Sequence, residues 1–75
     1  MRKAGNMKLK LARVEKGLSQ QELAYLVDAS RQTIGLIESD KYNPSLNLCI
    51  RIAQELGKTL DQLFWKEEQS NEHGI

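Results

Sequence analysis

Three consecutive polar side chains have the chemistry to read the edges of DNA bases. Arg31, Gln32 and Thr33 open a predicted helix. Arginine and glutamine form paired hydrogen bonds to guanine and adenine, and the methyl group of threonine contacts that of thymine. Leu36 lies at the border of the same outward surface. These four residues are therefore the candidate base-reading residues.

Two short helical patterns and a tight break position these side chains. The first pattern runs over residues 20–27 and the second over residues 31–39, each with apolar residues at helical spacing. Only Asp28, Ala29 and Ser30 separate them, which is too short for anything but a sharp turn. The spacing predicts a helix-turn-helix.

Capping and core residues support both helices. Ser19 and Ser30 stand directly before the two patterns, where a hydroxyl accepts a hydrogen bond from a first-turn N–H. Glu22 follows Ser19 at the spacing of a capping box. Ala24 provides a small residue where the helices cross, and Ile34 lies on the inner face of the second helix.

The segments LSQQELA, SRQTIGLIE and KYNPSL resemble the Cro/C1-type (XRE) helix-turn-helix regulators, particularly short stand-alone bacterial members of the cytolysin-operon repressor type. The resemblance covers approximately Leu9 to Phe64. It implies an all-α, compact five-helix, lambda-repressor-like DNA-binding domain. It also implies a transcriptional regulator, most often a repressor, that binds a palindromic double-stranded DNA operator as a homodimer. Asp28 departs from the glycine of many members, but aspartate tolerates a left-handed backbone better than most residues.

The resemblance further implies a structural ion pair between Arg13 and Glu38. Arginine matches the geometry of a carboxylate with two parallel hydrogen bonds. The alternative for Arg13 is a direct contact with DNA.

A second group of polar residues is suited to binding the phosphates of the DNA backbone. Ser19 and Gln20 begin a helix whose N–H groups and dipole favour an anion, and Ser30 begins the next one. Lys41 and Asn43 lie in the loop after the reading helix, where phosphate contacts would fix its position. A plain connecting loop is the alternative for these last two.

Three further helices are predicted around the motif. Residues 8–16 form the first and end at Gly17, residues 46–56 form the fourth and end at Gly57, and a short last helix runs from Leu60 to Phe64 or Trp65. The fourth is the clearest amphipathic pattern, with a predicted buried stripe of Leu46, Cys49, Ile50, Ala53 and Leu56.

The last helix carries more apolar surface than its length can bury. Leu60 and Leu63 suit the core, while Trp65 suits either the core or a partner surface. Aromatic residues are enriched in protein interfaces, so we expect a homodimer interface formed by Leu60, Leu63, Phe64 and Trp65.

The two ends lack a helical pattern. Residues 1–6 are expected to form a flexible basic lead, residues 7–65 the DNA-binding domain and residues 66–75 a flexible polar tail. A short strand over residues 2–7, paired with the tail after Phe64 as a terminal β-ribbon, is the alternative.

Composition favours one small domain in a reducing compartment. The chain has 75 residues and one cysteine, so no internal disulfide forms. No apolar run approaches the roughly 20 residues that cross a membrane. The resemblance implies a bacterial cytoplasmic, nucleoid-associated location. The formal net charge is only +1, so DNA affinity must come from a few well-placed cations and from a second copy of the chain.

Catalytic chemistry has little support in the sequence. Cys49 lies on the predicted core stripe and His73 in the tail, so no nucleophile–histidine pair, metal site or cofactor site is expected. The alternative to a DNA-binding regulator is an antitoxin-like or accessory module on the same fold, with residues 60–65 binding another protein.

Overall fold

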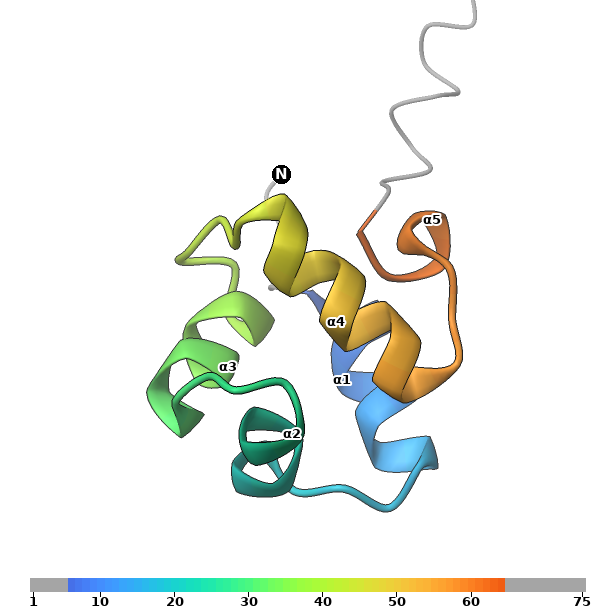
Figure 1. The fold of residues 1–75 in the computed structure, drawn as a ribbon, viewed down its shortest axis with the longest axis horizontal. Helices are drawn as coiled ribbons and strands as arrows, with labels where there is room; N and C mark the ends of the chain where they lie inside the picture. Colours follow the sequence, from blue (N-terminus) through green and yellow to red (C-terminus); the bar gives the residue numbers. More distant parts are fainter. Residues whose placement is uncertain (1–5, 65–75) are drawn as a thin grey trace, which may run out of the picture.

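The computed structural model of the chain describes residues 6–64, and this range contains five α-helices and no strand. Figure 1 shows α2 and α3 on one side of the molecule and α5 on the other, with α4 and α1 between them. The predicted all-α fold is confirmed. The helices are α1 (Met7–Glu15), α2 (Gln20–Leu26), α3 (Arg31–Glu38), α4 (Leu46–Leu56) and α5 (Leu60–Phe64).

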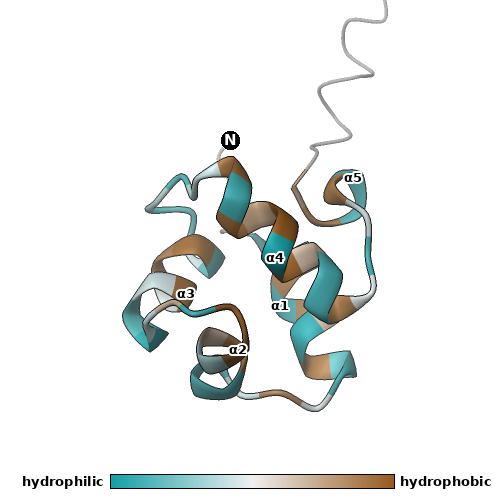
Figure 2. Cartoon of the chain, in the orientation of Figure 1, coloured by the Kyte–Doolittle hydropathy of each residue, from teal (hydrophilic) through white to brown (hydrophobic). Residues whose placement is uncertain are grey.

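The core draws apolar side chains from every helix. Leu9, Leu23, Ile34 and Ile52 are fully buried, and Leu63 of α5 is 2% exposed. Figure 2 shows brown, hydrophobic segments on all five helices. Full burial of one such side chain stabilises the fold by about 1.5–3 kcal/mol. The core therefore holds the short helices in place, since each is too short to be stable alone in water.

The predicted buried stripe of α4 is wrong at two positions. Leu46 is 67% exposed and Ile50 is 36% exposed, while Ile52, Ala53 and Leu56 are buried. The helix has more apolar positions than one face can bury. Packing against the other helices selects the face, and the N-terminal part of α4 keeps apolar side chains at the surface.

The helix ends share one hydrogen-bond pattern. After α1 the N–H of Leu18 donates to the carbonyl of Arg13 at 3.1 Å, and after α2 the N–H of Ala29 donates to that of Ala24 at 2.9 Å. These are Schellman closures, which require a left-handed residue just past the helix. That residue is glycine after α1 and α4 and aspartate after α2 and α3: Gly17, Gly57, Asp28 and Asp40.

Asn6 ties the start of α1 to two other helices. Its side-chain oxygen accepts from the N–H of Leu9 at 3.0 Å, as an N-cap does. Its backbone N–H donates to the carbonyl of Glu38 at 2.7 Å, and its side-chain amide donates to that of Leu63 at 3.0 Å. Asn6 is thus bonded to the folded domain, although it falls within the predicted flexible lead of residues 1–6.

The predictions for residues 1–5 and 65–75, including most of the alternative strand, lie outside the described residues. Met7 is the first residue of α1, not part of a strand. No helix within residues 6–64 has the length and hydrophobicity needed to cross a membrane.

Candidate nucleic-acid interface

The predicted base-reading residues of α3 differ in how far their side chains are exposed to solvent. Arg31 and Gln32 are exposed, and neither forms a side-chain hydrogen bond or ion pair with another residue of the described range. Leu36 is half-buried, one helical turn after Gln32. The outward face of α3 therefore offers two polar groups to an outside ligand, with an apolar side chain beside them.

Thr33 and Ser30 interact with each other at the start of α3. The hydroxyl of Ser30 accepts from the N–H of Thr33 at 3.0 Å, which caps the helix. The two hydroxyl oxygens lie 2.9 Å apart. Ser30 therefore acts as the predicted cap, and the bond between the two hydroxyl groups uses one of their two protons, so the other hydroxyl can still donate to a ligand.

A buried carboxylate links α3 to the rest of the domain. The side chain of Glu38 is 6% exposed and that of Arg13 is 9% exposed. Nε of Arg13 lies 2.6 Å from Oε2 of Glu38, and Nη2 donates to Oε1 at 3.1 Å. Nη1 of the same guanidinium donates to the carbonyl of Leu18 at 2.9 Å. The ion pair expected between Arg13 and Glu38 is thus present, and it is bidentate.

Gln20 joins this pair from α2. Its side-chain Nε2 donates to Oε1 of Glu38 at 3.0 Å. Gln20 is a predicted phosphate contact, but its side-chain amide binds inside the domain. We call Arg13, Gln20 and Glu38 the Glu38 cluster. It joins three helices, because each of its residues comes from a different one, and it fixes the direction of α3.

The N-terminus of α2 is closed by a capping box. Ser19 Oγ accepts from the N–H of Glu22 at 3.0 Å, and Oε1 of Glu22 accepts from the N–H of Ser19 at 2.8 Å. The hydroxyl of Ser19 is therefore already used as an acceptor. A phosphate at this helix end would lie near the charged Glu22 and would have to bind the remaining backbone N–H groups.

The loop after α3 extends the polar surface. Lys41 and Asn43 are exposed between α3 and α4. The N–H of Lys41 donates to the carbonyl of Leu36 at 2.8 Å, which closes the end of α3 with Asp40 in the left-handed conformation. The backbone of Lys41 is therefore fixed relative to α3, although its side chain extends into solvent.

The predicted dimer residues divide between core and surface. Leu63 is 2% exposed and packs within its own chain, whereas Leu60 and Phe64 are half-buried. Trp65 lies outside the described residues. Leu60 and Phe64 thus keep part of their apolar surface available to a partner.

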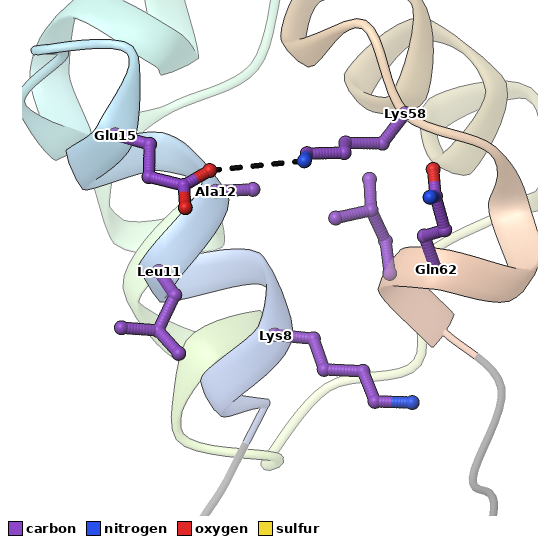
Figure 3. A pocket seen from close by; sticks show the side chains of 7 residues that line it. Lys8, Leu11, Ala12, Glu15, Lys58 and Gln62 are labelled. Carbon is purple, nitrogen blue, oxygen red and sulfur yellow. Dashed lines mark ion pairs between the residues drawn. The ribbon is translucent and has the colours of Figure 1, made fainter.

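A shallow hollow between α1 and α5 lies away from α3. Its volume is about 180 Å³, and Figure 3 shows Lys58 reaching toward Glu15 across it, with Nζ and Oε1 3.7 Å apart. Its lining carries no cysteine, histidine or serine. Elsewhere, burial raises the pKa of the half-buried Cys49 thiol, which disfavours the reactive thiolate. Residues 6–64 hold no cluster of three metal-binding side chains.

Comparisons with known proteins agree with this arrangement. A family model described as "Helix-turn-helix" matches residues 9–63. An uncharacterized HTH-type transcriptional regulator of Methanocaldococcus jannaschii is 43% identical over 61 residues, covering 81% of this chain and 92% of that protein. YgzD, an uncharacterized HTH-type transcriptional regulator of Bacillus subtilis, is 36% identical over 63 residues, covering 84% and 96%.

A solved structure shows the same fold. The restriction-modification controller protein C.AhdI from Aeromonas hydrophila superposes with a TM-score of 0.73 at 34% sequence identity, over 79% of this chain and 89% of that chain. The family model also matches most of the chain, from α1 to α5. The chain therefore belongs to the helix-turn-helix family of DNA-binding transcriptional regulators, in its Cro/C1 (XRE) type.

Proposed function

We propose that this protein is a sequence-specific transcriptional repressor that binds duplex DNA as a homodimer. The observation that carries the proposal is the outward face of α3, where Arg31 and Gln32 are exposed and have no side-chain partner within residues 6–64. Polar side chains of this kind add nothing to a core, but they match guanine and adenine edges. The α3 helix enters the major groove with these residues facing the bases.

Contacts with the DNA backbone position the helix. Lys41 and Asn43 follow α3 in the chain and bind phosphates beside the groove. At the start of α2, Ser19 and the backbone N–H groups of the first turn face the neighbouring phosphate. Gln20 acts mainly by holding Glu38, since its amide is 3.0 Å from that carboxylate.

Dimerisation gives two reading helices for one operator. The half-buried Leu60 and Phe64 supply the apolar contact together with Trp65. Two-fold symmetry requires a palindromic operator with half-sites about one DNA turn apart. Occupying a promoter then blocks polymerase sterically. C.AhdI is a restriction-modification controller protein, and its similarity supports a regulatory role. This role would be carried out in the cytoplasm, at the nucleoid.

Selection from a random pool of duplex DNA tests the proposal directly. The full chain should enrich a palindromic consensus, and sedimentation should show a dimer bound to it. Enrichment of a sequence without two-fold symmetry would contradict the dimer. Weak, salt-sensitive binding with no consensus would contradict sequence-specific repression.

An antitoxin-like or accessory protein-interaction module is the second candidate. The exposed Leu46 and Ile50 at the N-terminal part of α4 favour it, because they add an apolar surface beyond that of α5. The same selection separates the two candidates. A module of this kind would bind DNA only weakly and without sequence preference.

A further inference from the structure

The recognition helix contains a glycine that its own structure does not require. Gly35 stands in the interior of α3, and it is the only glycine within the helices of residues 6–64. A glycine inside a helix destabilises it by about 1 kcal/mol relative to alanine. Gly17 and Gly57 have positive φ angles, which explains glycine there, but Gly35 does not. Its backbone conformation therefore gives no reason for the absence of a side chain.

Packing gives no reason either. A Cβ atom added at Gly35 would meet Oε1 and Nε2 of Gln20 at 3.9 Å, which is ordinary van der Waals contact, with no other heavy atom nearer. Alanine would therefore fit between α3 and α2 without moving either helix. The helix would gain stability from it, and the fold would lose nothing.

The position of Gly35 on the helix gives the missing reason. Residues three and four apart are neighbours on a helix surface. Gly35 is four residues after Arg31, three after Gln32 and directly before Leu36. It therefore lies beside both reading side chains on the helix surface, on the side nearest to Gln20 of α2.

We infer that Gly35 is a specificity-determining residue of the DNA interface, at which the bare backbone of α3 contacts the floor of the major groove. This inference rests on the proposed function. Without a side chain at this point, the helix axis comes closer to the base edges. Arg31 and Gln32 then reach their bases in the paired geometry, and the glycine Cα lies against an apolar group such as a thymine methyl.

A side chain at this position would act as a spacer. Alanine adds one methyl group and leucine adds four carbon atoms, so the helix would be held progressively further from the bases. Lengthening every reading contact weakens binding even though Arg31 and Gln32 are unchanged. The same substitution stabilises the free protein, so stability and affinity should move in opposite directions.

The test compares Gly35→Ala and Gly35→Leu with the unchanged chain on the duplex that the unchanged chain selects from a random pool. Melting temperature is measured by circular dichroism and affinity by fluorescence anisotropy. Gly35→Ala should melt about 2–8 °C higher, from the helix propensity of alanine. It should bind about tenfold or more weakly, comparable to the loss of one good base contact. Gly35→Leu should bind more weakly still.

Two controls separate a spacer from a disturbance of the protein. Gln54→Ala lies on an exposed part of α4 away from α3 and should leave affinity unchanged. Gly35→Ala is also made in a Gln20→Ala background, which removes the amide nearest to the new methyl group. The same loss of affinity in both backgrounds is expected if the methyl group acts on DNA.

Several results would overturn the inference. Unchanged or tighter binding by Gly35→Ala would show that α3 does not approach the bases at this point. A lower melting temperature would assign the glycine to packing, as would a loss of affinity that disappears in the Gln20→Ala background. In each case the selected consensus, and so the proposed function, would stand. Failure of the unchanged chain to select any consensus would instead overturn the proposed function.

Discussion

Helices α1 and α4 end on glycine, whereas α2 and α3 end on aspartate, although the chain reverses in the same left-handed way at each end. The φ angles are +74° and +67° at Gly17 and Gly57, and +61° and +64° at Asp28 and Asp40. A residue with a Cβ atom is strained in this conformation and glycine is not. The supporting helices thus close without strain, while the two helices of the reading motif close at a local cost.

The interior of α3 and its contacts with the rest of the domain also show that it has little stability of its own. Its eight residues include a central glycine, so little of its stability is local. It is held instead from outside, by Arg13 and Gln20 at the Glu38 carboxylate and by Asn6 at the Glu38 carbonyl. The reading helix therefore depends for its stability on α1, on the residue before α1 and on α2.

The largest effect is expected from breaking the buried ion pair. Arg13→Ala leaves the Glu38 carboxylate buried without its main partner and should lower the free energy of unfolding by about 3–5 kcal/mol, measured by urea denaturation. Glu15→Ala is the matched control, because its pair with Lys58 is partly exposed, at 3.7 Å. That pair should contribute about 0–1 kcal/mol.

A double variant keeps this test informative if Arg13→Ala fails to fold. Arg13→Met combined with Glu38→Leu removes both charges and should recover much of the lost stability. Equal effects of Arg13→Ala and Glu15→Ala would contradict the view that α3 depends on the Glu38 cluster.

The next largest effect is expected from substitutions that weaken DNA binding without disturbing the fold. Gln32→Ala should cost about 1–3 kcal/mol of binding free energy and relax the preference at one base pair, because a paired contact to the base is lost. Lys41→Ala should weaken binding to all sequences and reduce the dependence of affinity on salt. Fluorescence anisotropy at several salt concentrations distinguishes them. If Gln32→Ala left both affinity and base preference unchanged, α3 would not be the reading helix.

Most of the helical framework could be predicted from the sequence, because local signals specify it. Ser19 and Ser30 cap α2 and α3 as their positions indicate. The three residues between the two predicted helical patterns left room only for a turn, and the left-handed conformation expected at Asp28 is present. Caps and short turns depend on neighbouring residues alone, so a single sequence is enough to find them.

The features that could not be predicted are contacts between residues far apart in the sequence, which depend on how the helices pack. The bond from Gln20 to Glu38 spans 18 positions, and that from Asn6 to Leu63 spans 57. No local pattern marks either one, although an asparagine three residues before Leu9 does indicate an N-cap. The exposure of Leu46 arises in the same way, because tertiary packing decides which part of an apolar stripe is covered.

A smaller effect is expected at Asn6, where the reading helix and the supporting helices meet. Asn6→Ala removes the cap of α1 and the bond to Leu63 but keeps the backbone bond to Glu38. It should lower the free energy of unfolding by about 0.5–2 kcal/mol, as measured by urea denaturation. Asn6→Asp is the control, since it keeps the capping oxygen and replaces the amide donor with a charged carboxylate oxygen beside the Leu63 carbonyl. A loss limited to Asn6→Ala would assign the effect to the cap alone.

The smallest effect is expected from exchanging aspartate and glycine at the left-handed positions after two of the helices. Asp28→Gly should raise the free energy of unfolding by about 0.5–1 kcal/mol, because the relieved strain exceeds the extra entropy of glycine in the unfolded chain. Gly57→Asp should lower it by a similar amount, since a Cβ atom there meets nothing within 4 Å and only the backbone is strained. The ion pair of Asp28 with Arg51 is long, at 3.9 Å, and exposed, so its loss contributes little. Thermal unfolding of both variants measures the difference. A loss of stability in Asp28→Gly would mean that the aspartate side chain stabilises the turn by more than its backbone strain costs. The difference between the supporting helices and the reading motif would then be confined to α3.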